Sequence, residues 1–242
     1  MKERSWYHFL FPSSQNNPDQ VSHQKGRVTF SQSGEDIIID HLFRILKIDH
    51  PTYIDVGAHH PYNINNTALL YERGCRGINI EPDPRLFENF VKYRKDDINL
   101  NIGISDEPAV LDFFVMSSPT LNTFSKEEAI RMEQETNYRI ARREQIKVDT
   151  INNVVQQHHN GIFPDFFSLD VEGFDQRILK SIDFSVHRPA VICVETLTFS
   201  DQGLGIKLQE TSQYLESKGY FMYADTYINS LFVDQHKWST TS

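Results

Sequence analysis

Two strand-like apolar segments near the start of the chain, residues 53–58 and 78–84, each carry a carboxylate. The two acids, Asp55 and Glu81, lie 26 residues apart, which leaves room for a helix between them. This order predicts a β-α-β unit whose parallel strands end at one edge of a sheet. An acid ending the second strand can accept two hydrogen bonds from a ribose diol. One glycine after the first strand, Gly57, suits a nucleoside cofactor without a pyrophosphate, because dinucleotide sites use three.

Composition narrows the class of protein. The 242 residues fit one α/β domain, and 39% apolar with 24% charged residues is ordinary for a globular chain. The net charge of −9 argues against a nucleic-acid-binding surface. No stretch approaches the roughly 18 apolar residues of a membrane span, and the N-terminus lacks a signal-peptide pattern, so we expect a cytoplasmic location. Cys75 and Cys193 are expected to be reduced, buried thiols.

Strand and helix patterns alternate along most of the chain. Strands are expected at 52–56, 77–81, 98–104, 166–170 and 190–195, with a final antiparallel pair at 220–226 and 230–234. Helices are expected at 67–72, 84–94, 150–158, 175–181 and 206–218. This order predicts an α/β fold with helices on both faces of a mostly parallel sheet. We expect a poorly ordered lead-in at 1–27 and a single domain at 28–242.

The alternation of strand and helix patterns is interrupted in the middle of the chain. Residues 109–115 alternate as an edge or hairpin strand, a polar loop follows, and a highly charged helix is predicted for Lys126–Gln145. This helical excursion, at about 117–145, is either solvated decoration or a lid that forms an acceptor wall over a strand-end site. The sequence leaves both interpretations open.

Three further acids end later strands of the predicted sheet. Asp170 and Glu172 follow the fourth strand, and Glu195 ends the fifth. In an open parallel sheet these ends face the crevice of the first two acids, where carboxylates repel one another unless they bind a cation or share a proton. The three are therefore candidates for catalysis, or for holding a divalent ion such as Mg²⁺ or Mn²⁺. Asp175, by contrast, is expected only to cap the next helix.

Other polar residues fall at the same predicted end of the sheet. His59 could take a proton from an acceptor hydroxyl, although adjacent histidines in a turn are more often surface residues. Side chains that could bind acceptor hydroxyls, or simply form turns, are Asn66, Thr67, Asn122 and Thr123. A Walker loop is missing, as is the three-glycine fingerprint, so phosphoryl and hydride transfer are both disfavoured.

A polar segment lies about 20 residues before the first predicted strand. Ser33 with Asp36 resembles a capping box, which predicts the start of a helix at Ser33. Gln32 and Glu35 lie in the same segment, and on the residues alone their expected role is also the helix start.

Six strings, in this order, resemble those of the FkbM-type methyltransferases: Phe30–Asp36, Tyr53–Pro61, Arg76–Pro84, Leu121–Ser125, Ser168–Asp175 and Arg188–Glu195. The resemblance covers nearly the whole chain. It implies a class I methyltransferase fold, which is a Rossmann-like three-layer sandwich with a mostly parallel sheet and an antiparallel C-terminal strand. It also implies S-adenosylmethionine as the cofactor.

The resemblance also implies roles for matched residues. Cofactor contacts are expected from Asp55, Gly57, Ala58, Glu81, Pro82, Asp83, Gln32 and Glu35. Near the transferred methyl group we expect Asp170, Glu172 and Glu195, with Mg²⁺ or Mn²⁺ on these acids as an open alternative to direct proton transfer.

The implied reaction is methylation of a hydroxyl, commonly on a sugar of a polysaccharide or glycoconjugate. Two alternatives stay open, namely methylation of a small-molecule or lipid intermediate and a non-catalytic nucleoside-binding module. Expected partners are a glycan or small-molecule acceptor, a glycosyltransferase of the same pathway and further copies of the chain, but no nucleic acid.

Overall fold

The structure, a computed structural model, describes residues 26–198 and 205–241. The lead-in expected at 1–27 lies outside the described residues apart from its last two positions. Within the two described ranges, no helix has the length and apolar character needed to cross a membrane.

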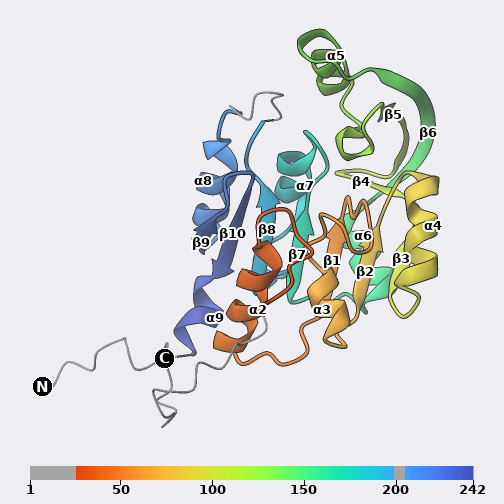
Figure 1. Cartoon of the computed structure of the whole chain (residues 1–242). Helices are drawn as coiled ribbons and strands as arrows, with labels where there is room; N and C mark the ends of the chain where they lie inside the picture. The colour runs from red at the N-terminus through yellow and green to blue at the C-terminus, as the bar shows by residue number, and fades with distance from the viewer. Residues whose placement is uncertain (1–25, 199–204, 242) are drawn as a thin grey trace, which may run out of the picture.

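The central sheet has seven strands in the order β3-β2-β1-β7-β8-β10-β9 (Figure 1). Their bounds are β1 Tyr53–Val56, β2 Gly77–Ile80, β3 Ile98–Leu100, β7 Phe166–Leu169, β8 Val191–Glu195, β9 Tyr220–Asp225 and β10 Asn229–Asp234. Neighbours from β3 to β8 pair in parallel, whereas β10 is antiparallel to both β8 and β9. The predicted mostly parallel sheet with an antiparallel C-terminal strand is confirmed.

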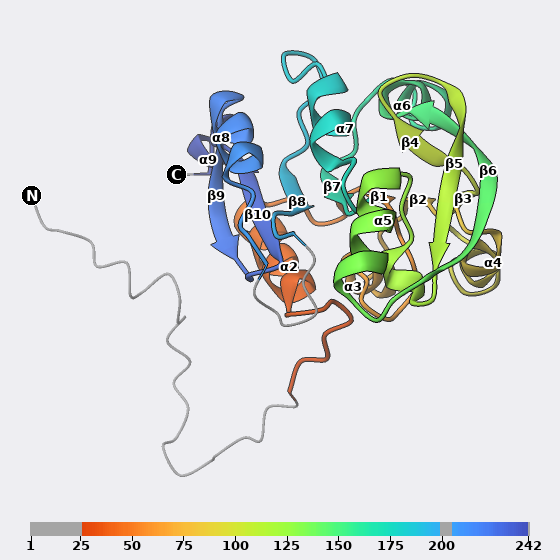
Figure 2. The same cartoon turned by 90° about the horizontal axis from the view of Figure 1, so that it is seen from above.

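Helices cover both faces of this sheet and complete a three-layer sandwich (Figure 2). One face packs against α2 (Glu35–Ile45) and α3 (Ala68–Glu72). The other packs against α6 (Ile151–His158), α7 (Asp175–Ser181) and α8 (Gln209–Ser217). Beside the edge strand lies α4 (Pro84–Tyr93), and α9 (Gln235–Ser239) follows the last strand. Because both faces are covered, the inner strands are mostly apolar and are buried apart from Glu195 at the end of β8, as parallel strands usually are.

A smaller second sheet lies at one end of the central sheet (Figure 1). It has three strands in the order β4-β6-β5, with bounds β4 Gly103–Ser105, β5 Ala109–Met116 and β6 Ile140–Thr150. The chain passes from β5 to β6 through a 3-10 turn, η1 (Pro119–Leu121), and a helix, α5 (Lys126–Glu135).

The helix predicted for Lys126–Gln145 is wrong in its second half. It ends at Glu135, and residues 140–150 form β6. The first eight residues of β6 alternate between half-buried and exposed side chains, and the strand pairs antiparallel with the whole of β5. This period of two is that of a strand, and charged residues on both sides of the strand obscure it in the sequence.

The single strand predicted at 98–104 is in fact two. Residues 98–100 pair with β2 in the central sheet, and residues 103–105 pair with β6 in the second sheet. Asn101 lies between them and donates hydrogen bonds from Nδ2 to the backbone oxygens of Glu81 (2.8 Å) and Pro82 (3.0 Å). A polar residue that binds the neighbouring strand end therefore divides the apolar run.

The capping box predicted at Ser33 and Asp36 is also wrong. The residue before α2 is Gly34, with φ 91°, which offers no side chain for a cap, and the amide of Asp36 donates to Ser31 Oγ (3.3 Å) rather than to Ser33. The Asp36 carboxylate instead accepts hydrogen bonds from Thr29 Oγ1 (2.6 Å) and from the backbone N–H of Phe30 (2.7 Å). Asp36 therefore fixes the segment that precedes the helix.

Candidate functional site

The carboxyl ends of β1, β2 and β7 open on a cavity that the second sheet closes on one side. The cavity holds about 610 Å³ of space, including its open mouth. Its polar side chains are those of His59, Glu81, Thr120, Asn122, Asp170 and Glu172, and Gly57 also lines it. Apolar surface comes from residues that include Leu86, Phe113 and Phe124. Strand ends of open α/β sheets are where such folds bind ligands.

The turn after β1 approaches the end of β7 very closely. Gly57 has φ 78°, and a Cβ placed on it would lie 1.8 Å from the backbone oxygen of Asp170. The amides of Gly57 and Ala58 both donate to the carbonyl of Ile80, each at 3.1 Å. Only glycine satisfies both the left-handed backbone and the missing space.

Glu81 presents a buried carboxylate to the cavity. Its Oε2 accepts a hydrogen bond from the His59 amide (2.8 Å), and its Oε1 accepts one from the Asp83 amide (2.7 Å). Burial raises the pKa of Glu81 to about 8 despite these two bonds. Each oxygen keeps a further lone pair, so the carboxylate can accept two hydroxyl donors.

Asp55 lies behind the cavity rather than in its lining. Its Oδ2 accepts hydrogen bonds from Asn65 Nδ2 (3.0 Å) and from Thr67 Oγ1 (2.9 Å), and its side chain is buried. Burial raises its pKa. The structure therefore uses Asp55 to hold the loop between β1 and α3, and this loop carries Gly57 and His59.

A buried arginine supports the same loop. Arg94 has no exposed surface and makes an ion pair of 2.9 Å with Asp97. Its guanidinium also donates to the hydroxyl of Tyr53 (2.7 Å) and to the carbonyl of Pro61 (3.1 Å). Sequence reasoning missed Arg94, Asp97 and Asn65, because nothing in a lone Arg at a helix end indicates that it is buried.

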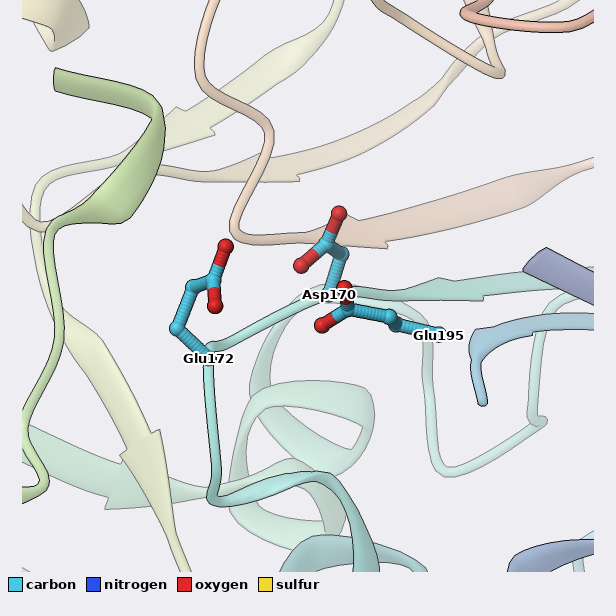
Figure 3. Close-up of side chains that lie close together, drawn as sticks. All are labelled: Asp170, Glu172 and Glu195. Atoms are coloured by element: carbon cyan, nitrogen blue, oxygen red, sulfur yellow. The ribbon is translucent and has the colours of Figure 1, made fainter. Parts of the chain in front are cut away.

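The three acids expected to converge are brought together (Figure 3). Asp170 follows β7, Glu172 lies on the loop between β7 and α7, and Glu195 ends β8. One carboxylate oxygen from each lies within 4.8 Å of the others. Burial, and then the charges of Asp175 and Asp55, raise the pKa of Asp170 to about 7. Burial, and then the charge of Asp170, raise the pKa values of Glu172 and Glu195. Such a group can share protons, accept one near neutral pH, or bind a cation.

The side chain of Asp175 holds the loop that carries Glu172. Asp175, the first residue of α7, accepts hydrogen bonds from the amides of Val171 (3.2 Å) and Gly173 (3.3 Å). Burial raises the pKa of Asp175 to about 6. The capping role expected for Asp175 is therefore wrong: the residue before α7 is Phe174, no side-chain cap is formed there, and Asp175 instead holds the loop that carries Glu172.

The two histidines of the first turn have different surroundings. His59 lines the cavity, and burial together with the neighbouring His60 lowers its pKa. It is therefore neutral at pH 7 and able to accept a proton. His60 Nδ1 accepts hydrogen bonds from the amides of Tyr62 (3.1 Å) and Asn63 (3.0 Å), so it shapes the turn.

The four residues expected to bind an acceptor separate into two pairs. Asn122 lines the cavity, and Asn66 is half-buried with Nδ2 3.3 Å from Ser168 Oγ. Thr67 and Thr123 are buried, and their hydroxyls bond inside the protein, to Asp55 Oδ2 and to the backbone oxygen of Glu172.

The remaining expected cofactor residues lie at varied distances from the cavity. Pro82 lines it. Asp83 caps α4 by accepting from the Arg85 amide (2.9 Å). Gln32 is exposed, and Glu35 is buried against the β9-β10 hairpin. Burial opposes ionisation of Glu35, but hydrogen bonds from Thr226, from the backbone and from Asn229 outweigh it and lower its pKa.

The residues at the cavity fit a nucleoside that carries a positive charge. Gly57 leaves space against β7, Glu81 has lone pairs for a ribose diol, and the three acids offer negative charge farther along the strand ends. The same three carboxylates also suit a hard divalent cation, since Mg²⁺ and Mn²⁺ prefer oxygen ligands.

A family model described as the methyltransferase FkbM domain matches residues 55–222. No curated protein matches the chain. Among solved structures, the chain is similar to a protein provisionally assigned as a caffeoyl-CoA O-methyltransferase from Staphylococcus aureus, with 9% identity, TM-score 0.47 and 86% of each chain covered. It is also similar to the precorrin-6y C5,15-methyltransferase from Geobacter metallireducens GS-15, with 11% identity, TM-score 0.39 and coverage of 81% of this chain and 87% of that chain. Likenesses this remote say nothing about the reaction.

Proposed function

The chain belongs to the FkbM methyltransferase family, and we propose that it transfers the methyl group of S-adenosylmethionine to a hydroxyl oxygen of a sugar. The observation that carries the proposal is the meeting of Gly57, Glu81, Asp170 and Glu172 at one strand-end cavity, with the carboxylate of Glu195 within 4.8 Å of the last two. The first two suit a nucleoside, and the acids suit a reaction that removes a proton.

The cofactor half of the cavity is proposed to lie along β1 and β2. Glu81 accepts hydrogen bonds from the two ribose hydroxyls, and Gly57 with Pro82 provides the surface beside them. Asp55 and Asp83 act indirectly, because their carboxylates fix the loop after β1 and the start of α4. When bound, the cofactor supplies an electrophilic methyl group on a sulfonium sulfur.

The acid trio is proposed to receive the proton of the acceptor. As the hydroxyl oxygen bonds to the methyl carbon and the carbon–sulfur bond breaks, a carboxylate oxygen of Glu172 or Glu195 takes the hydroxyl proton. Their raised pKa values match a general base better than those of exposed carboxylates do. His59, neutral in the same cavity, is the alternative base.

A divalent ion offers a second route through the same residues. Asp170, Glu172 and Glu195 would hold Mg²⁺ or Mn²⁺, which lowers the pKa of a bound hydroxyl. Hydroxyl groups of a sugar are proposed to bind Asn122 and Asn66, which lie at the same end of the sheet.

The first test is calorimetric titration with S-adenosylhomocysteine, in EDTA and then in Mg²⁺ or Mn²⁺. We expect micromolar binding by the wild type and none by Glu81→Ala. Methyl transfer is then measured from S-adenosylmethionine to a panel of sugars. Glu172→Gln and Glu195→Gln should bind the nucleoside normally yet lose turnover. Glu210→Gln, an exposed control on α8, should bind the nucleoside and turn over like the wild type.

Each outcome separates the proposal from an alternative. No nucleoside binding under either condition refutes the assignment. Binding with transfer only to small molecules or lipids replaces the sugar by another acceptor. Binding without transfer to any acceptor favours a nucleoside-binding module, and full turnover in both acid variants removes the trio from the reaction.

A further inference from the structure

Glu172 lies in an unusual backbone conformation. Its φ is 50°, in the left-handed region that residues with side chains rarely adopt, and Gly173 follows with φ 98°. A residue in this region persists only where its surroundings hold it there. The conformation matters because it decides where the side chain leaves the chain, and here the carboxylate points toward those of Asp170 and Glu195 (Figure 3).

One side-chain hydrogen bond holds this residue from the second sheet. Thr123 donates from Oγ1 to the backbone oxygen of Glu172 at 2.7 Å. The same hydroxyl accepts from the amide of Ser125 at 2.8 Å, so both of its bonds are internal. Thr123 is 1% exposed, and this leaves its hydroxyl no room to contact an acceptor in the way the sequence led us to expect.

Thr123 is itself rigidly placed. Its amide donates to the carbonyl of Phe114 (3.1 Å) and its carbonyl accepts from the amide of Phe114 (2.8 Å), which ties it to β5. The residue before it, Asn122, and the residue after it, Phe124, both line the cavity. The wall of the cavity and the backbone of Glu172 are therefore connected through one hydroxyl.

We infer that Thr123 is a positioning residue, whose hydroxyl sets the backbone of Glu172 and so aims its carboxylate at Asp170 and Glu195. The catalytic consequence rests on the proposed function, because it requires the acid trio to act in the transfer. The positioning of the Glu172 backbone by Thr123 does not depend on the proposed function. Asn122 lies directly before Thr123 in the chain. An acceptor that contacts Asn122 therefore contacts the segment whose next residue positions Glu172.

The test compares three variants. Thr123→Val keeps the shape of the side chain and removes its hydroxyl, and Thr123→Ser restores the hydroxyl. Thr136→Val is a matched control, because Thr136 also donates to a backbone oxygen, that of Met132, and accepts from the amide two residues later. Its bonds lie at the far end of α5, away from the cavity.

Two measurements are made on each variant. The ¹³Cα and ¹³Cβ chemical shifts of Glu172 report whether its backbone is left-handed, and they require no activity. Turnover and the affinity for S-adenosylhomocysteine report the function. We expect Thr123→Val to shift the Glu172 signals and to lower kcat on the order of 10- to 100-fold, as misplacement of a reacting group does, with cofactor affinity within about twofold. Thr123→Ser and Thr136→Val should match the wild type.

Unmoved Glu172 signals in Thr123→Val overturn the positioning role. Moved signals with full turnover overturn its catalytic consequence alone. A wild type that binds no S-adenosylhomocysteine refutes the proposed function but leaves the signals to decide the positioning. If Thr123→Val does not fold, Thr123→Cys replaces it, because a thiol is a weak donor. Wild-type signals in the Cys variant would then contradict the inference.

Discussion

Replacing Glu81 with glutamine should remove a loss of stability that the wild type undergoes as the pH rises from 5 to 8. Burial raises the pKa of Glu81 from its ordinary 4.5 to about 8 in the folded protein. Between these values the folded chain keeps a proton that the unfolded chain has released. The wild type therefore loses stability as the pH rises through this window, and the glutamine variant, which does not titrate, avoids this loss.

The size of the effect follows from the width of the window. One proton of difference changes the free energy of unfolding by about 1.4 kcal/mol per pH unit. Between pH 5 and pH 8 the wild type should thus lose about 3 to 4 kcal/mol relative to Glu81→Gln. The assay is urea denaturation of both proteins at half-unit steps of pH, without cofactor.

Glu35→Gln is the matched control, since Glu35 is also a buried glutamate but its pKa is lowered. The stability that Glu35 contributes is complete above its unfolded pKa and is lost only as the pH falls through its folded pKa. Its difference from the wild type should stay nearly constant from pH 6 to pH 8. A difference between wild type and Glu81→Gln that is equally flat would refute the reasoning about Glu81.

Three further outcomes are expected. Gly57→Ala should abolish S-adenosylhomocysteine binding in calorimetry, because its Cβ meets backbone, whereas Gly34→Ala, with φ 91° and open space, should retain it. Arg94→Met should lower the free energy of unfolding by about 3–5 kcal/mol, since it leaves Asp97 buried without its partner. The exposed counterpart Arg76→Met should cost less than about 1 kcal/mol in the same denaturant titration. If a divalent ion takes part, EDTA should abolish turnover and Mn²⁺ should restore it; unchanged turnover in EDTA would exclude that route.

The central sheet could be predicted from the sequence because its signals are local. Each parallel strand is a short apolar run, each is followed by a helical pattern, and parallel strands of such units end at one edge. The acids at the ends of two strands, Asp170 and Glu172 after β7 and Glu195 on β8, could therefore be placed together from the sequence. Their separation could not, because it depends on loop conformations such as the left-handed backbone of Glu172.

The second sheet could not be predicted, because its strands are recognisable only from how they pair with one another and not from their own residue patterns. The strand β6 has charged residues on both of its sides, and only its partner β5 distinguishes it from a solvated helix. Side-chain direction was equally hidden. Asp55 and Glu81 are both acids on predicted strands. The carboxylate of Asp55 nevertheless bonds to Asn65 behind the loop, whereas that of Glu81 faces the cavity.

The way the second sheet joins the central fold bears on how such a protein can change. The chain enters it through β4 and leaves it through β6, and these two strands are parallel neighbours, paired from Gly103 with Val148 to Ser105 with Thr150. Everything between them is therefore one contiguous insert with adjacent ends. Exchange of residues 109–147 between relatives would alter the wall opposite the strand ends and leave the central sheet continuous. Under the proposed function, the range of acceptors would then change by recombination of a single segment.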